Sequence, residues 1–202
     1  MPDELVFQEK DHKYFFNGEE IPSVSELTRF LSREIYGEAD PIALERAAER
    51  GTAIHKALQE LDETGTVEVD SEYEGYIQAY MKFRQEHTVL WYQVERQLTN
   101  GKYAGTIDRA GLVDGEYCIV DFKTTSRISK SHELLYSVAQ TLYSRLSKAN
   151  NFTAEKLYIL QLKNDGTYKL IALSFNHPLA QACIDLHEAF ANAKKRASKK
   201  RK

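Results

Sequence analysis

Residues 101–125, GKYAGTIDRAGLVDGEYCIVDFKTT, decide the fold that the sequence predicts. This stretch contains two β-like runs that flank the dipeptide Asp114-Gly115. Aspartate and glycine tolerate the positive φ angles that the central residues of a tight hairpin turn adopt. We therefore expect two antiparallel strands joined by a two-residue loop.

The two-residue loop fixes which residues of the hairpin face each other. Val113 must face Glu116, and counting outward from that pair places Asp108 directly opposite Asp121. Lys123 lies two residues beyond Asp121 and projects from the same face. Directly opposed side chains have Cβ atoms about 4.5–5.5 Å apart, and two like charges at that distance destabilise a sheet unless a cation lies between them. A metal ion would satisfy that requirement.

The strand that precedes the hairpin extends the same face. Residues 88–99 form a β-rich run, and Asn-Gly at 100–101 predicts a second two-residue turn. In that register Glu95 lies opposite Thr106 and diagonal to Asp108. The side chains expected on one face of this three-stranded meander are Glu95, Asp108, Asp121 and Lys123.

Length and composition fit one globular domain. The chain has 202 residues, of which 42% are hydrophobic, and a domain of this size buries roughly 70% of its unfolded surface. No apolar run approaches the roughly 20 residues of a membrane span, and the acidic N-terminus does not resemble a signal peptide. We therefore expect a cytoplasmic protein with no membrane partner. Cys118 and Cys183 are too few for a zinc or iron–sulfur cluster, and we expect both to be buried, reduced thiols.

Charge is unevenly distributed along the chain. Residues 194–202 hold seven of the 27 lysines and arginines and no acid, which leaves 20 basic against 30 acidic residues elsewhere. We expect one domain over residues 1–193, with residues 1–40 as a hairpin-and-helix appendage, and a basic C-terminal tail at 194–202. The tail either contacts a polyanion such as a phosphate backbone or is a solvated helix end whose cations complement the helix dipole.

Helices are predicted before the meander. Ser23 begins a helix, with Glu26 completing a capping box. A longer helix over residues 41–62 carries Gly51 and His55. Because a glycine inside a helix costs about 1 kcal/mol relative to alanine, we expect it to make room for something that passes close to His55. Taken alone, a helical histidine is more often a surface or satisfied core residue than a ligand.

The rest of the chain adds further helices and strands. The helix predicted at residues 131–149 carries Gln140 and Tyr143 on one face. The other predicted elements are a helix at 71–87, strands at 155–163 and 167–175, and a helix from residue 178 into the tail. The order is thus helix, three-stranded meander, helix and strands.

Facing carboxylates beside a lysine suit phosphodiester hydrolysis. Mg²⁺ binds through one or two carboxylates and leaves its other positions to water and phosphate. An ion at Asp108 and Asp121 would lower the pKa of a bound water and neutralise a phosphate oxygen. Lys123 would orient that water or stabilise developing charge. Taken singly, Asp-x-Lys on a strand is better explained as an ion pair between neighbours.

The order of these residues resembles the PD-(D/E)XK nuclease superfamily, in particular its RecB-like branch and related phage and mitochondrial exonucleases. The resemblance covers about residues 22–175. It rests on Pro22-Ser23-Val24-Ser25, Gly51-x-x-x-His55, Glu95, Gly105-Thr-Ile-Asp108, Asp121-Phe-Lys123-Thr, and Gln140 with Tyr143. It implies an α/β fold with a restriction-endonuclease-like core, in which helices flank a central mixed β-sheet.

The resemblance also implies roles for these residues. Asp108 and Asp121, with the backbone carbonyl of Phe122, would bind Mg²⁺ or Mn²⁺, and Lys123 would be catalytic. Gln140 and Tyr143 are one residue closer together than is common in the family, and the cysteines of its iron–sulfur members are missing, so no cluster is expected. The residues expected to assist at the metal are His55 and Glu95, and those expected near the substrate are Gln140, Tyr143, Ser23 and Thr124.

Three functions fit these expectations. The first is a metal-dependent deoxyribonuclease that acts on single strands or duplex ends, as an exonuclease or end-processing enzyme rather than a sequence-specific endonuclease. The second is a non-cleaving nucleic-acid-binding or assembly protein on the same fold, which would have no need for the opposed Asp108 and Asp121 carboxylates. The third is a small-molecule enzyme that uses the same metal patch.

Overall fold

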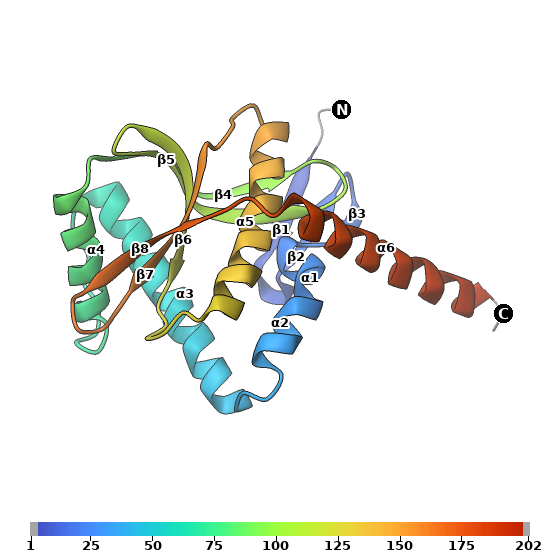
Figure 1. Ribbon diagram of the computed structural model, residues 1–202, viewed down its shortest axis with the longest axis horizontal. Helices are drawn as coiled ribbons and strands as arrows, with labels where there is room; N and C mark the ends of the chain where they lie inside the picture. The colour runs from blue at the N-terminus through green and yellow to red at the C-terminus, as the bar shows by residue number, and fades with distance from the viewer. Residues whose placement is uncertain (1–3, 200–202) are drawn as a thin grey trace.

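A five-stranded mixed sheet forms the centre of the computed structural model, which describes residues 4–199 (Figure 1). The strands lie in the order β4-β5-β6-β7-β8. β6 and β7 are parallel, and the other neighbouring pairs are antiparallel. Their bounds are Val89–Thr99 (β4), Ala104–Val113 (β5), Glu116–Lys123 (β6), Lys156–Leu162 (β7) and Tyr168–Leu173 (β8).

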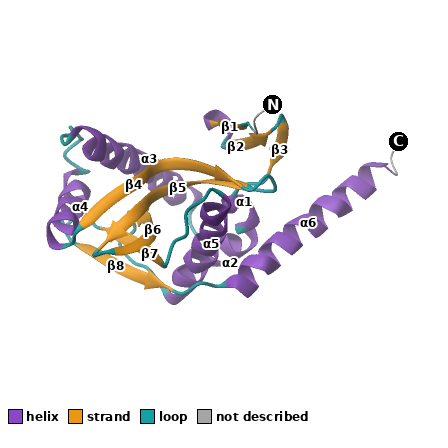
Figure 2. Cartoon of the chain, turned by 90° about the horizontal axis from the view of Figure 1, so that it is seen from above, coloured by secondary structure: helices purple, strands orange, loops and turns teal. Residues whose placement is uncertain are grey.

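Helices cover both faces of this sheet (Figure 2). One face carries α3 (Pro41–Thr64) and α4 (Glu74–Glu86). The opposite face carries α1 (Val24–Leu27), α2 (Arg29–Tyr36), α5 (Lys130–Ala149) and α6 (His177–Lys199). Side chains of β6 alternate between the two faces of the sheet. Val120 and Phe122 pack with α3 and α4, whereas Ile119 packs with α5. The predicted α/β class, a central mixed sheet flanked by helices, is confirmed.

A second sheet lies at the N-terminal end of the described chain. Its antiparallel strands are β1 (Leu5–Gln8), β2 (Lys13–Phe16) and β3 (Glu19–Ile21), with a short 3₁₀ helix, η1 (Glu9–Asp11), between the first two. The predicted two-stranded hairpin therefore gains a third strand. The Ala104 N–H donates to the Pro22 carbonyl at 3.0 Å, and Ser23 forms a parallel bridge with Ala104. These contacts join the small sheet to the start of β5.

Helix termini follow the predicted capping residues. Ser23 and Glu26 form both hydrogen bonds of a capping box at the start of α1. The Asp40 side chain caps α3, which ends where Gly65 takes a φ of 81°. α3 is thus two residues longer than the predicted helix at 41–62, and α6 includes the first part of the basic tail. Residues 200–202 of that tail lie outside the described residues.

The Asp114-Gly115 turn has the predicted register. Val113 pairs with Glu116, and the two turn residues have φ angles of 51° and 86°. The β5–β6 ladder continues in this register as far as Arg109 and Val120. Continuing the same count places Asp108 opposite Asp121, one position beyond the last pair of the ladder.

The predicted two-residue turn at 100–101 is wrong. Thr99 pairs with Ala104, so the loop has four residues. The Asn100 side chain accepts hydrogen bonds from the N–H groups of Lys102 and Tyr103, and only Gly101 in this loop takes a positive φ, of 80°. An asparagine side chain that mimics a backbone turn in this way stabilises a wider loop than the type I′ two-residue turn, which needs two positive φ angles.

The wider loop changes the position of Glu95. Thr106 pairs with Gln97 and not with Glu95. The pairs Val94–Arg109 and Arg96–Ile107 flank Glu95, and the same count places it across from Asp108. Glu95 itself takes a φ of 44°, a left-handed conformation that is uncommon for a residue other than glycine. The correction therefore moves Glu95 from a diagonal position to one that faces Asp108.

Both cysteines are buried and free, as predicted. Among residues 4–199, no helix is long and apolar enough to cross a membrane. α6 packs through Ala180 and Cys183 and then projects away from the rest of the molecule in both views (Figures 1 and 2).

Candidate active site

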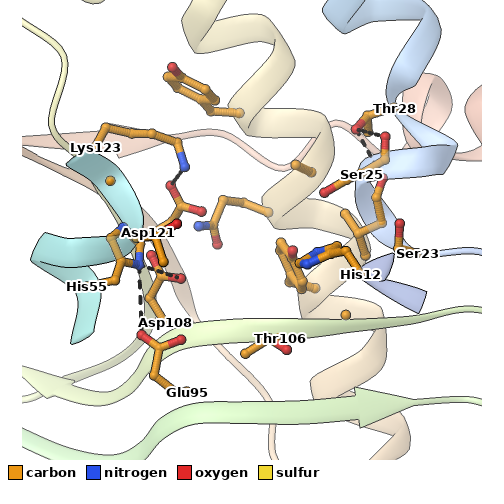
Figure 3. A pocket seen from close by; sticks show the side chains of 18 of the residues that line it. His12, Ser23, Ser25, Thr28, His55, Glu95, Thr106, Asp108, Asp121 and Lys123 are labelled. Carbon is orange, nitrogen blue, oxygen red and sulfur yellow. Dashed lines mark hydrogen bonds and ion pairs between the residues drawn. The ribbon is translucent and has the colours of Figure 1, made fainter. Parts of the chain in front are cut away.

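One cavity of about 860 Å³ gathers the titratable side chains that the sequence singled out. They come from four elements: α3, β4, β5 and β6. Figure 3 shows them on one side of the cavity. The residues brought together are His55, Glu95, Asp108, Asp121 and Lys123.

A separation between β5 and β6 gives these side chains their positions. Beyond Arg109 and Val120, the carboxylate of Asp108 accepts a hydrogen bond of 2.7 Å from the Phe122 N–H. The side chain thus takes the place of a backbone acceptor at the point where the ladder stops. Asp121 lies beside this contact, and Lys123, two residues further, shares its face of the strand.

His55, Glu95 and Asp108 form a group that could hold a metal ion. One ligand atom from each lies within 4.8 Å of the others. The Nδ1 atom of His55 is 3.6 Å from Asp108 Oδ1 and 3.8 Å from Glu95 Oε1, and both separations exceed ordinary hydrogen-bond lengths. Imidazole and carboxylate ligands together suit a first-row ion such as Mn²⁺, and the carboxylates also suit Mg²⁺.

The other ring nitrogen of His55 indicates how the imidazole is oriented. Nε2 lies 3.3 Å from the Phe122 carbonyl oxygen, which can only accept a hydrogen bond, so Nε2 is the donor. In the neutral ring, Nδ1 then carries a lone pair that faces the carboxylates of Glu95 and Asp108. Three acceptor atoms that converge in this way repel one another unless a cation lies between them, and this donor set therefore fits a metal.

Asp121 and Lys123 form an ion pair within the same cavity. Burial lowers the pKa of Lys123, but the Asp121 and Asp108 carboxylates together raise it above its ordinary value. Burial raises the pKa of Asp121, and Asp108 adds to this effect against the opposing charge of Lys123. The Lys123 ammonium also lies 5.3 Å from the centre of the Tyr136 ring, within the range of a cation–π contact. Lys123 is thus charged and held from two sides.

The carboxyl group of Glu95 has a raised pKa. Burial and the Asp108 charge raise it to about 7, although His55 and Arg109 oppose the shift. Ionisation of a carboxyl group in this environment is unfavourable unless a further cation is bound nearby.

Metal-free protein is expected to lose stability through Glu95 as the pH rises from about 4.5 to about 7. The ordinary pKa of this carboxyl is 4.5 and its folded-state pKa is about 7, so the folded state binds more protons than the unfolded state in this window and is favoured at the acidic end. Melting temperatures measured in chelator should fall less steeply across the window for Glu95→Gln than for the wild type. Glu116→Gln, at an exposed position on β6, is the control, and identical slopes for wild type and Glu95→Gln would contradict the assignment.

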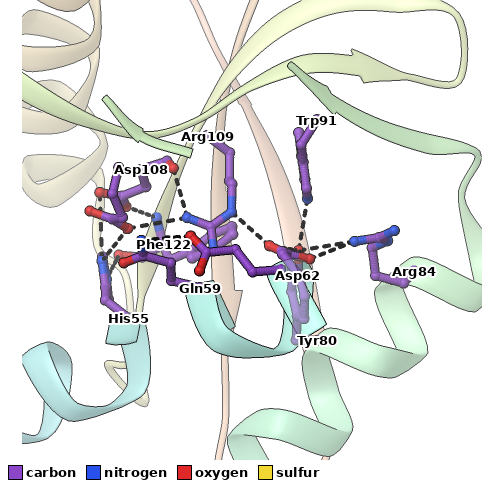
Figure 4. A network of polar contacts seen from close by, with 11 residues as sticks. His55, Gln59, Asp62, Tyr80, Arg84, Trp91, Asp108, Arg109 and Phe122 are labelled. Carbon is purple, nitrogen blue, oxygen red and sulfur yellow. Dashed lines mark hydrogen bonds and ion pairs between the residues drawn. The ribbon is translucent and has the colours of Figure 1, made fainter. Parts of the chain in front are cut away.

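A buried arginine, which the sequence did not single out, supports the site from behind (Figure 4). The side chain of Arg109 is fully buried and forms ion pairs with Asp62 of α3 at 2.8 Å and with Glu95 at 3.1 Å. It also donates a hydrogen bond of 2.7 Å to the Asp108 carbonyl. Asp62 accepts further hydrogen bonds from Tyr80 and Arg84. This network fixes β4, β5 and α3 relative to one another next to the metal-competent group.

The residues predicted near the substrate divide into two groups. Ser23, Gln140 and Tyr143 line the cavity, whereas Thr124 is buried and is not part of the lining. A Cβ on Gly105 would lie 2.6 Å from the Tyr143 ring, so the glycine allows this ring to pack against β5. Gln140 is 1% exposed, and neither atom of its amide has a hydrogen-bond partner among the described residues.

Gly51 lies next to open space in the cavity. A Cβ at this position would have no described neighbouring atom within 4 Å. The residue lines the cavity, so no segment of the described chain passes close to it. The missing side chain instead widens the cavity near His55.

Comparison with known proteins finds similarity to solved structures. No family model matches the chain, and no curated protein sequence matches it. An alkaline exonuclease from Laribacter hongkongensis is 14% identical, with a TM-score of 0.38 over 72% of this chain and 84% of that one. The same enzyme in complex with dAMP is 13% identical, with a TM-score of 0.40 over 89% and 94%. A phage-related exonuclease from Haemophilus somnus 129PT is 11% identical, with a TM-score of 0.41 over 81% and 88%. These three structures belong to two exonucleases.

Proposed function

We propose that the chain is a divalent-metal-dependent nuclease that hydrolyses phosphodiester bonds of DNA, with a core of the PD-(D/E)XK type. The observation that carries this proposal is the convergence of His55 Nδ1, Glu95 and Asp108 within 4.8 Å, beside the ion pair of Asp121 with Lys123. The order of these residues along the chain supports it independently, through the resemblance described above.

The residues of the chain have different tasks in this proposal. His55, Glu95 and Asp108 would hold the ion, and Asp121 and the Phe122 carbonyl are proposed as further ligands. Bound Mg²⁺ or Mn²⁺ lowers the pKa of a coordinated water and neutralises charge on the phosphate. Lys123 donates hydrogen bonds to the attacking water or to the charge that develops on the phosphate oxygens. Asp121 keeps the Lys123 ammonium charged and oriented.

The proposed substrate is DNA with an accessible end, and the enzyme acts as an exonuclease or end-processing nuclease. The carboxylate patch lies inside a cavity that α1, α3, α5 and the N-terminal sheet all help to line. An accessible strand end has the freedom to reach carboxylates that are recessed in this way.

Cleavage of labelled DNA tests this function. With Mn²⁺, the protein is expected to degrade 5′- and 3′-labelled linear strands and to spare covalently closed circular DNA, and chelator should abolish the activity. Asp121→Ala should lower the rate on the order of a hundredfold or more, because it removes the carboxylate charge beside the proposed metal and Lys123. Asp165→Ala, in the exposed turn between β7 and β8, should leave it unchanged.

Two results would count against this reading. Equal rates for the wild type and Asp121→Ala would mean that the observed cleavage arises elsewhere. Binding of labelled DNA without any cleavage in Mn²⁺ or Mg²⁺ would instead favour the non-cleaving binding protein.

A further inference from the structure

Three aromatic rings of the N-terminal sheet line the same cavity as the proposed metal site. They belong to Phe7 on β1, to Tyr14 on β2, and to His12, which joins η1 to β2. The Phe7 ring lies 4.7 Å from the Tyr14 ring and 5.1 Å from the His12 ring. We call Phe7, His12 and Tyr14 the aromatic wall. Figure 3 shows His12 on the side of the cavity away from His55 and Lys123.

The aromatic wall is fixed relative to the metal-competent group. The Tyr14 hydroxyl lies 2.8 Å from the Thr106 hydroxyl on β5. Thr106 is two residues from Asp108 on the same strand, which corresponds to roughly 7 Å along it. This hydrogen bond places the Tyr14 end of the wall one strand repeat away from Asp108.

Exposure distinguishes the members of the wall. Tyr14 is the buried member of the wall, with 1% of its surface exposed. Phe7 is partly buried and His12 is exposed. His12 also takes a φ of 51°, a conformation that costs a non-glycine residue some stability. The His12 ring is thus not a core residue, and it meets the Phe7 ring edge to face, with 89° between the two planes.

Gln140 of α5 lines the same cavity. Its buried amide lines the cavity without a hydrogen-bond partner for its nitrogen or its oxygen among the described residues. An amide with a free donor and a free acceptor matches the edge of a nucleobase, which presents both kinds of group. Leaving such a group buried and unpaired is unfavourable, and a base would satisfy it.

We propose that the aromatic wall and Gln140 form a subsite for the base of an unpaired nucleotide adjacent to the bond that is cut. This inference rests on the proposed nuclease function and specifies its substrate as DNA with a single-stranded end. Stacking on aromatic rings is tolerant of sequence because every base has a π-face, so the subsite selects unpaired structure and not a particular sequence.

Binding measured without metal tests the subsite separately from catalysis. The probes are a fluorescent oligothymidylate and a strand of equal length whose terminal residues are abasic, both in chelator. Wild-type protein is expected to bind the intact strand on the order of tenfold more tightly, because the abasic strand lacks the base that stacks on the wall. His12→Asn, which tolerates the left-handed conformation, and Phe7→Leu, which keeps an apolar side chain, should each lose most of this discrimination.

Tyr92→Ala is the matched control, because Tyr92 is an exposed ring on β4 that stacks on Tyr117 outside the cavity. It should bind both probes like the wild type, and thermal melting should show that all variants are folded. If wild type binds both probes equally, or folded His12→Asn and Phe7→Leu retain the discrimination, the subsite is wrong even when Mn²⁺-dependent cleavage is present. Discrimination that depends on these residues, in a protein that cleaves nothing in Mn²⁺, would uphold the subsite and reject the nuclease.

Discussion

Lys123→Ala is expected to lower the rate of DNA cleavage in Mn²⁺ by on the order of a hundredfold to a thousandfold, the loss that follows removal of one group that stabilises transition-state charge. The Asp121 and Asp108 carboxylates keep the Lys123 ammonium charged, so at neutral pH the wild type retains its positive charge and its donors. Alanine provides neither. Single-turnover rates with end-labelled DNA at saturating protein measure this loss apart from any change in binding.

Lys156→Ala is the matched control for Lys123→Ala. Lys156 lies on the adjacent strand β7 and pairs with Glu116 at 3.3 Å, but this pair is exposed and outside the cavity. Its removal should leave the single-turnover rate unchanged. A similar loss for both variants, or retention of full activity by Lys123→Ala, would remove Lys123 from the proposed mechanism.

Arg109→Leu is expected to lower the free energy of unfolding by about 3–5 kcal/mol, the range found when one partner of a buried ion pair is removed. The Asp62 side chain is 5% exposed and would keep its charge with less compensation, and Glu95 would lose a cation 3.1 Å away. Chemical denaturation followed by circular dichroism measures the change.

Arg84→Leu is the control for Arg109→Leu, because Arg84 pairs with the same Asp62 carboxylate. The Arg84 side chain is 39% exposed, so its loss should cost less than about 1 kcal/mol. Adding Asp62→Asn to Arg109→Leu should recover part of the stability, since it removes the charge left unpaired. Equal effects of the two arginine substitutions would show that burial of the Arg109 pair contributes little.

Local rules were sufficient to predict the hairpin that carries Asp108 and Asp121. An Asp-Gly turn specifies its own geometry, and strand alternation then determines which side chains share a face. The same rule failed at Asn100-Gly101, because the Asn100 side chain hydrogen-bonds to Lys102 and Tyr103 and stabilises a wider loop. The error in register was small enough that Glu95 still lies on the predicted face, now across from Asp108.

Other features depend on contacts that sequence spacing does not encode. The Arg109–Asp62 pair joins residues 47 positions apart, and Arg109 looks like an interruption of an apolar strand until α3 is in place. A charged residue at an inward position of a buried strand was the available clue, since such a side chain needs a partner. The third N-terminal strand was missed for a similar reason, because Glu19–Ile21 is short and two of its three residues are acidic.

The bond from the Phe122 N–H to the Asp108 carboxylate has a practical consequence. Asparagine at position 108 retains an oxygen that can accept this bond, so Asp108→Asn should preserve the junction of β5 and β6 while it removes the negative charge. Truncation to alanine would remove both. Asp108→Asn is therefore the variant best suited to trapping uncut DNA for crystallography, because it keeps the hydrogen bond that joins β5 to β6 and removes only the charge proposed to bind the metal.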